Sequence, residues 1–274
     1  PPRCWRAGRA ANCRSDRVGD PAGFAAFRLS MRWNPQDESK PSTGLKVIVR
    51  IRILILYAVL VIGGVIHILG RYATTMLQIA GWMLIALAIW LAVEFIWWLK
   101  SKPESRTGHR DDQPHFLVWG LTVVVLTWSL EWLGVHTGVI FGDYQYHPVL
   151  RPQFAGVPLA IGFSWLTLLL SAAALERRLP FRPHADAAFI RSLRIAVLLL
   201  VFDLVMEPGA VNLGYWRWQG GVVPWKNYLT WFGIGWALAF VTLRLDLWRR
   251  SFPKIAPHFY LAQMVYFSLV ILAA

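Results

Sequence analysis

The chain has 274 residues, of which 56% are hydrophobic and 16% charged, and it contains 16 tryptophans. This composition excludes an ordinary soluble domain and is typical of an integral membrane protein. The formal net charge is +13, but most basic residues flank apolar segments, where they orient helices and meet anionic lipid headgroups. We therefore expect membrane lipids as partners and no binding of nucleic acid.

The first 44 residues differ from the rest of the chain. They carry both cysteines, Cys4 and Cys13, and are rich in Arg, Ala and Gly. They lack the apolar centre of a signal peptide, and the cysteines match no metal spacing or disulfide framework. We interpret 1–44 as a disordered tail or a spurious extension of the reading frame, with Met31 as an alternative start. The remainder, 45–274, is predicted to be one transmembrane helical domain.

About seven apolar stretches follow, each near the ~20 residues that a helix needs to cross a bilayer. Their apolar residues are continuous rather than alternating, which favours helices over strands. The predicted spans are 47–69, 74–99, 116–135, 157–175, 190–207, 228–245 and 259–273. The expected fold class is all-α, a polytopic (multi-pass) helical bundle.

The basic residues predict how the helices are oriented. From Lys46 onward, one set of flanks holds most of the Lys and Arg, including Arg177, Arg178, Arg191 and Arg194. The other set holds only Arg71, Arg151, Arg217 and Lys226. The positive-inside rule therefore predicts a cytoplasmic amino end, an outside carboxyl end and a location in the cell membrane.

Three carboxyl groups lie inside the predicted helices, near their outer ends. Glu131 precedes the end of the third helix by about one turn. Asp203 and Glu207 are four residues apart, hence on one face of the fifth helix. Pro208 is predicted to end that helix, because proline cannot continue the hydrogen-bond ladder. Ionisable groups at this depth are costly, so these carboxyl groups are the first candidates for catalysis.

Two predicted outer loops bring further polar and aromatic side chains to the same level. The loop 134–148 reads GVHTGVIFGDYQYHP, and the segment 207–218 reads EPGAVNLGYWRW. They supply two more candidate catalytic residues, His136 and Asp143, and the candidate substrate-binding residues Tyr144, Tyr146, His147, Asn212, Tyr215, Trp216 and Trp218. The alternative for an aromatic residue at a membrane edge is an interfacial anchor, which we favour for Trp132, Trp225 and Trp231.

The same histidines and carboxylates raise the question of a metal site. No His-x-x-x-His or Glu-x-x-His pair occurs, and the histidines lie on a glycine-containing segment whose geometry the sequence does not fix. We therefore assign no metal ligands, although the residue types leave a metal open.

The strings GVHTGVIFGDYQYHPVL, FAGVPLAIGFSW and DLVMEPGAVNLGYWRWQGG resemble those of the carotenoid biosynthesis membrane proteins. That family includes carotenoid 1,2-hydratases, among them the gamma-carotene 1',2'-hydratases and the bisanhydrobacterioruberin hydratases. The resemblance runs from about Leu45 to the end. It implies a hydro-lyase that adds water, without a cofactor, to the terminal C1=C2 double bond of an acyclic (psi) carotenoid end group. The implied partners are the lipophilic carotenoid, a terpenoid drawn from the bilayer, and other carotenoid-pathway enzymes.

Hydration of an alkene needs a strong acid, a means to stabilise a carbocation and a base that activates water. Burial and a neighbouring carboxylate both favour the protonated form of a carboxyl group, so we expect Asp203 or Glu207 as the acid and Glu131 as the coupled carboxylate. Aromatic faces attract a cation, a task that suits the tyrosines and tryptophans of the two loops. His136 or Asp143 would orient the water or accept its proton.

Two alternatives stay open. A carotenoid cyclase or isomerase would begin with the same protonation and differ in how the cation is quenched. A non-enzymatic transporter or channel would use the intramembrane carboxylates as ion sites, and it favours broken helices or repeats near the midplane. No repeat is evident, and the acidic residues gather at one edge of the membrane instead.

Overall fold

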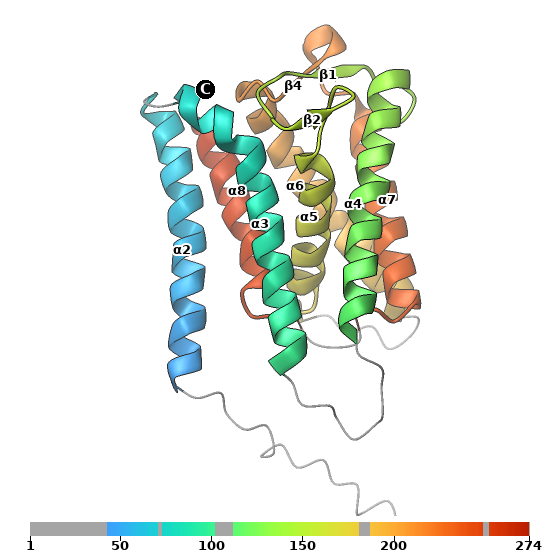
Figure 1. Ribbon diagram of the computed structural model, residues 1–274. Helices are drawn as coiled ribbons and strands as arrows, with labels where there is room; N and C mark the ends of the chain where they lie inside the picture. Colours follow the sequence, from blue (N-terminus) through green and yellow to red (C-terminus); the bar gives the residue numbers. More distant parts are fainter. Residues whose placement is uncertain (1–42, 71–72, 102–111, 181–186, 249–251, 274) are drawn as a thin grey trace, which may run out of the picture. The chain divides into compact units, whose positions relative to one another are not determined.

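The computed structural model describes residues 43–70, 73–101, 112–180, 187–248 and 252–273. Most of them are helical, as predicted (Figure 1). The helices in this part of the chain are α2 (Thr43–Ile68), α3 (Ala73–Ser101), α4 (Asp112–Thr137), α5 (Ala160–Glu176), α6 (Ala187–Asn212), α7 (Trp225–Arg244) and α8 (Ala256–Leu272). The predicted tail, Met31 and both cysteines lie outside the described residues.

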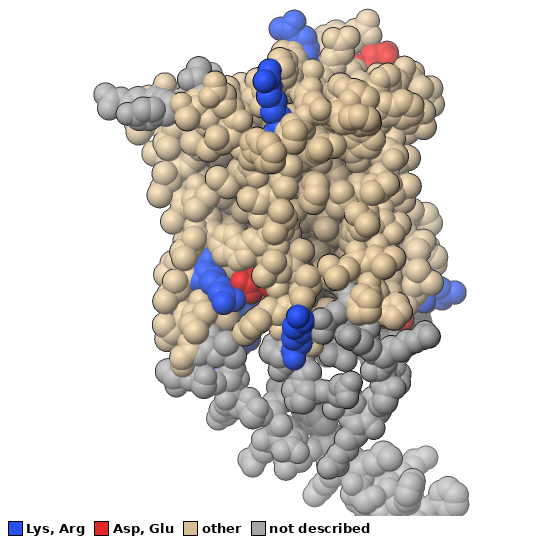
Figure 2. Space-filling model, viewed as in Figure 1, with Lys and Arg blue, Asp and Glu red and all other residues tan. Residues whose placement is uncertain are grey.

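The surface of the helices suits lipid rather than water. Within the described part of the chain, three helical segments are long and apolar enough to cross a membrane, namely Lys46–Ile68, Thr75–Lys100 and Pro114–Thr137, while α5 and α8 are apolar but shorter. Large apolar side chains such as Leu54 and Val118 are 67% exposed. On the face shown in Figure 2, charged side chains lie near both ends, and an uncharged belt separates them. The protein is therefore a membrane protein.

Helix α5 lies at the centre of the bundle. It packs against α3, α4, α6 and α8, and almost every one of its residues is buried. A Cβ atom at Gly162 would lie 2.4 Å from the carbonyl oxygen of Val124, so glycine is what lets α4 approach α5 this closely. A helix hidden on all sides does not show the amphipathic pattern of a surface helix.

Helix α6 corrects one of the sequence predictions. It does not end before Pro208 but continues through it to Asn212. Proline removes one N–H group from the ladder, and packing against neighbouring helices can compensate for that loss in a membrane protein. Gly209 brings α8 close at this point, since a Cβ atom there would lie 2.9 Å from the ring of Phe267. Glu207 is therefore held inside a packed helix rather than at its frayed end.

The two predicted outer loops are partly strands. β1 (Tyr144–Tyr146) pairs antiparallel with β4 (Trp216–Trp218), with Gln145 opposite Arg217. A second pair joins β2 (Gln153–Phe154) to β3 (Val157–Pro158), and a short 3₁₀ helix, η2 (Gln219–Gly221), follows β4. The predicted fourth span thus begins in a strand and becomes helical only at Ala160, while α4 extends to Thr137 and includes His136.

Ion pairs lie near the start of α2 and α6 and the end of α3 and α5, and these helix ends are the ones away from β1 and β4 (Figure 1). The Arg52 guanidinium is 3.0 Å from the Glu94 carboxylate, which also accepts a hydrogen bond from the Trp90 indole. Arg191 and Arg194 both pair with Glu176. Among the described residues, no ion pair reaches Glu131, Asp203 or Glu207. The carboxyl groups near the strand end are therefore not neutralised by basic side chains.

Candidate active site

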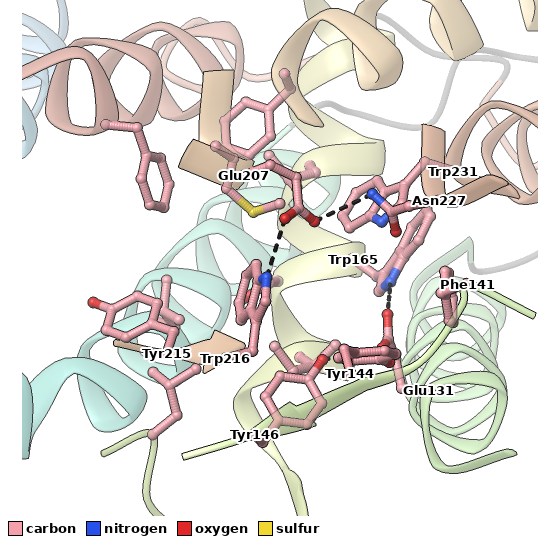
Figure 3. Close-up of a pocket in the computed structure, with 18 of the residues that line it drawn as sticks. Glu131, Phe141, Tyr144, Tyr146, Trp165, Glu207, Tyr215, Trp216, Asn227 and Trp231 are labelled. Carbon is pink, nitrogen blue, oxygen red and sulfur yellow. Dashed lines mark hydrogen bonds between the residues drawn. The ribbon is translucent and has the colours of Figure 1, made fainter. Parts of the chain in front are cut away.

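A cavity of about 630 Å³ lies beneath β1 and β4, between the ends of the helices. Glu131 of α4, Trp165 of α5, Glu207 of α6 and Asn227 of α7 line it, together with the aromatic residues of the two strands (Figure 3). We call this cavity the acid chamber. It combines a mostly apolar wall with a few polar groups, as ligand sites in proteins commonly do.

Glu207 faces the acid chamber and accepts hydrogen bonds from three donors. Its Oε2 accepts from the indole N–H groups of Trp216 at 3.1 Å and Trp218 at 2.9 Å. Its Oε1 accepts from the Asn227 side-chain amide at 3.2 Å. The strand β4 thus folds back over α6, the helix that precedes it. Successive side chains of a strand point to opposite faces, so Trp216 and Trp218 both point toward the Glu207 carboxyl group.

Asp203 lies one helical turn before Glu207 and is fully buried. Its Oδ2 accepts a hydrogen bond from Asn227 at 3.0 Å, so a single amide group links the two carboxyl groups. Its Oδ1 is buried and has no hydrogen-bond partner among the described residues. Asn227 thus holds two carboxyl groups of one helix face in fixed positions.

Glu131 forms a second polar group in the same chamber. Its Oε2 accepts hydrogen bonds from the hydroxyls of Tyr144 at 2.6 Å and Tyr146 at 3.0 Å, and its Oε1 accepts from the Trp165 indole at 3.3 Å. Two of the three carboxyl groups that were predicted to cluster, Glu131 and Glu207, therefore line the same cavity, and Asn227 links the third, Asp203, to Glu207.

The two tyrosines on β1 stay protonated over a wide pH range. Burial, followed by the negative charge of Glu131, raises the pKa of the Tyr144 phenol. The same two causes raise the pKa of Tyr146. Both hydroxyls are therefore available as hydrogen-bond donors at any pH near neutrality.

Aromatic rings form much of the remaining wall. Trp165 stacks on Trp231 with ring centroids 4.0 Å apart and planes 17° apart. Across the strand pair, Tyr144 lies 4.8 Å from Trp218, and Tyr146 lies 5.8 Å from Trp216. A cation held within about 6 Å of such faces is attracted by their quadrupoles.

Several of the residues proposed from the sequence do not line the acid chamber. His136 is exposed, and its ring bonds to the Trp132 carbonyl, while Asp143 is exposed beside Gly138. Asn212 is exposed at the end of α6, and His147 is partly buried, its backbone bonded to Tyr215. The roles given to these four stay predictions. The residues that the structure does bring together around the cavity are Glu131, Tyr144, Tyr146, Glu207, Tyr215, Trp216 and Trp218. Asp203 does not line the cavity but bonds to the same Asn227 amide as Glu207.

Most of the other lining residues were not anticipated. Among them, Asn227 and Gln263 are single amides in apolar helices, where no spacing marks them, and Trp165 is one tryptophan among many. The interpretation of Trp231 as an interfacial anchor is wrong, because its side chain is only 7% exposed. Trp225, by contrast, is 73% exposed.

The described residues contain no group of three or more His, Cys, Asp or Glu arranged to hold a metal ion. The candidate metal ligands considered from the sequence, His136, Asp143 and His147, do not converge on the three carboxyl groups.

Comparison with known proteins places the chain among its relatives. A family model described as carotenoid biosynthesis protein matches residues 112–274, which include every carboxyl group of the acid chamber. The chain belongs to the carotenoid biosynthesis protein family. It is similar to the bisanhydrobacterioruberin hydratase of Haloarcula japonica, with 34% identity over 119 residues. That match covers 41% of this chain and 40% of the relative. No solved structure matches the chain.

Proposed function

We propose that this protein hydrates the terminal C1=C2 double bond of an acyclic carotenoid end group. The observation that carries the proposal is the pair Asp203–Glu207, which Asn227 bridges and in which Glu207 faces an aromatic chamber. Neither carboxyl group has a basic partner among the described residues. Membership of the carotenoid biosynthesis family and the similarity to a hydratase support the choice of substrate.

The first step is protonation of the alkene. Glu207 lines the chamber and is the proton donor, and Asp203 is a second carboxyl group bonded to the same Asn227 amide. The proton adds to C2, and the electron pair of the double bond forms the new C–H bond. A tertiary carbocation remains at C1. The rings of Trp165, Trp231 and the strand aromatics stabilise it.

The second step is capture of the cation by water. A water oxygen forms the new bond to C1 and loses one proton to Glu131, whose tyrosine partners orient the water. The product is a tertiary alcohol, and return of that proton from Glu131 to Glu207 completes the cycle. Glu131 thus takes the role that the sequence suggested for His136 or Asp143.

The proposal includes a membrane arrangement. All seven described helices would cross the bilayer as a single domain, with the amino end in the cytoplasm and the acid chamber near the outer surface of the cell membrane. The carotenoid would reach the chamber from the bilayer, and neighbouring pathway enzymes would supply it. No redox step occurs, so the reaction needs no redox cofactor.

Expression in a lycopene-producing host tests the reaction. The wild-type protein should convert lycopene into a product heavier by one water. Asp203→Asn and Glu207→Gln should each abolish that product while the protein remains in the membrane. Glu94→Gln, which removes a carboxylate at the other end of the bundle, is the control and should retain the activity.

Three other results of this experiment would contradict the proposal. Products of unchanged mass with altered absorbance would replace hydration by cyclisation or isomerisation. Full activity of both Asp203→Asn and Glu207→Gln would refute the acid assignment. A wild-type protein that changes no carotenoid would refute the proposed function.

A further inference from the structure

We infer that a second cavity, between α2, α3 and α8, holds the polyene chain of the substrate and is its entrance from the membrane. This inference rests on the proposed function for the identity of the substrate. The cavity measures about 560 Å³, and we call it the polyene channel. It is lined chiefly by α2 and α3, which contribute little to the acid chamber.

The polyene channel adjoins the acid chamber, because Leu84, Tyr215, Gln263 and Phe267 line both cavities. A shift of these shared side chains would join the two cavities. A molecule longer than the acid chamber would then lie with its end group beside Glu207 and its remaining length in the second cavity. An acyclic carotenoid has this form, because its reactive end group is joined to a long, rod-like hydrocarbon.

The lining of the polyene channel selects an apolar occupant. It contains no charged residue. The Gln263 amide donates to the Phe259 carbonyl at 3.0 Å, and the Tyr266 hydroxyl lies 3.4 Å from the His67 ring. These polar groups are engaged within the protein, so the free surface is hydrocarbon and aromatic. A polar solute would lose its water there without compensation, whereas a polyene would not.

The position of the channel suits entry from lipid. α2 makes few close contacts with the other helices, and it lies at the edge of the bundle beside α3 and α8 in Figure 1. Two of the lining residues, Val59 on α2 and Ile79 on α3, are 38% and 42% exposed. The channel therefore reaches the outer surface of the bundle between two lipid-facing helices, where a bilayer-dissolved molecule can enter sideways.

Two small residues on facing walls keep the channel open. Ala80 lines it from α3. Gly63 lines it from α2, and a Cβ atom there would meet Met76 at 3.3 Å and Tyr266 at 3.5 Å. Ala80→Phe and Gly63→Leu should each fill the channel from one side without touching the carboxyl groups. Ala86→Phe makes the same change on an exposed face of α3 and is the matched control.

The test measures binding separately from reaction. Each variant is purified from lycopene-producing membranes, and the retained lycopene is quantified by absorbance per mole of folded protein. Glu207→Gln and Ala86→Phe should retain as much pigment as the wild type. Ala80→Phe and Gly63→Leu should retain about tenfold less or lower still. Because the two filled variants lie on different helices, a folding failure of one variant still leaves the other to test the channel.

The outcomes separate this inference from the proposed function. Loss of pigment in both filled variants, with retention in the control, supports the channel even if no hydrated product forms in any sample. Wild-type retention in both filled variants, or no retention in the wild type, overturns it.

Discussion

At the scale of single residues, Asp203 has the least satisfied polar group of the site. Its Oδ1 is buried without a hydrogen-bond partner among the described residues, and its Oδ2 depends on Asn227. An unpaired buried oxygen is costly. The arrangement is therefore held by the surrounding fold, and such destabilised groups are a recurrent property of active sites.

Asn227 should be essential for positioning the acid pair. Asn227→Ala removes the one amide that bonds to both Asp203 and Glu207. Hydrogen bonds to charged groups contribute about 1.5–3 kcal/mol, so we expect kcat to fall about 10- to 100-fold. KM should change little if the amide orients the acid rather than binds the carotenoid. Steady-state assays in nanodiscs measure both constants.

Leu229→Ala is the control for that experiment, because Leu229 lies on the same helix and is 58% exposed. It should behave as the wild type. An Asn227→Ala protein that keeps its kcat would show that the two carboxyl groups do not depend on their common amide.

The tyrosine hydroxyls predict a particular pH dependence. Tyr146→Phe should lower kcat about tenfold, because Glu131 loses one donor. Since burial and the charge of Glu131 raise the pKa of Tyr146, the hydroxyl keeps its proton above the pH at which a free tyrosine, with a pKa of about 10, would lose it. The ratio of wild-type to Tyr146→Phe rates should therefore stay constant from about pH 6 to pH 9. A ratio that falls toward one as pH rises would contradict this.

At the scale of secondary-structure elements, β1 and β4 act as a cover over the acid chamber. Their residues alternate, so that Tyr144, Trp216 and Trp218 are buried while Gln145 and Arg217 are exposed. The inner side chains bond to Glu131 and Glu207. One small sheet therefore connects the carboxyl groups of two helices, and its register sets their hydrogen bonds.

A proline at position 217 of β4 should abolish activity, whereas an alanine at the same position should not. Arg217→Pro removes the backbone N–H at the centre of the three-residue pairing, and proline is not tolerated in a paired strand. We expect displacement of both tryptophans from Glu207 and loss of detectable product. Arg217→Ala changes only an exposed side chain and should keep activity within about twofold. Product analysis in the lycopene-producing host compares the two, and equal activities would rule out the covering role.

The elements also show which features a sequence can predict. The helices could be predicted from hydropathy, because a helix that spans lipid must be apolar along its length. Asp203 and Glu207 could be predicted to lie on one helix face, because they are four residues apart. The alternation in Tyr-Gln-Tyr and Trp-Arg-Trp is typical of strands, but segments of only three residues form strands here because they pair with each other from distant parts of the chain. Asn227 could not be found, because a lone amide carries no pattern and its role depends on helix packing.

At the scale of the whole molecule, the described helices separate two chemical environments. Arg52, Arg191 and Arg194 pair with acids at one end, whereas the carboxyl groups at the other end bond to indoles, phenols and an amide. Ion pairs near the basic end are compatible with water and lipid headgroups. Neutral donors around the acid chamber hold the carboxyl groups without supplying a permanent positive charge that would suppress proton transfer to an alkene.

This separation predicts the orientation of the protein in the membrane. Lys100 is exposed at the basic end of α3, and Gln219 is exposed next to the strand cover. The positive-inside rule puts Lys100 in the cytoplasm and Gln219 outside. In a background where Cys4 and Cys13 are replaced by Ser, a membrane-impermeant maleimide should label Gln219→Cys in intact cells. It should label Lys100→Cys only after permeabilisation.

The reverse labelling pattern would put the acid chamber at the cytoplasmic surface. Labelling of both positions in intact cells would mean that Lys100 and Gln219 lie on one side, with an even number of crossings between them. The predicted pattern instead requires an odd number of crossings. Helices α4, α5 and α6 lie between the two positions, and of these only α4 is among the described helices with membrane-spanning length and composition. With α4 crossing, the predicted pattern therefore means that α5 and α6 both cross or that neither does, and it rules out a crossing by only one of these two helices, which carry Trp165, Asp203 and Glu207.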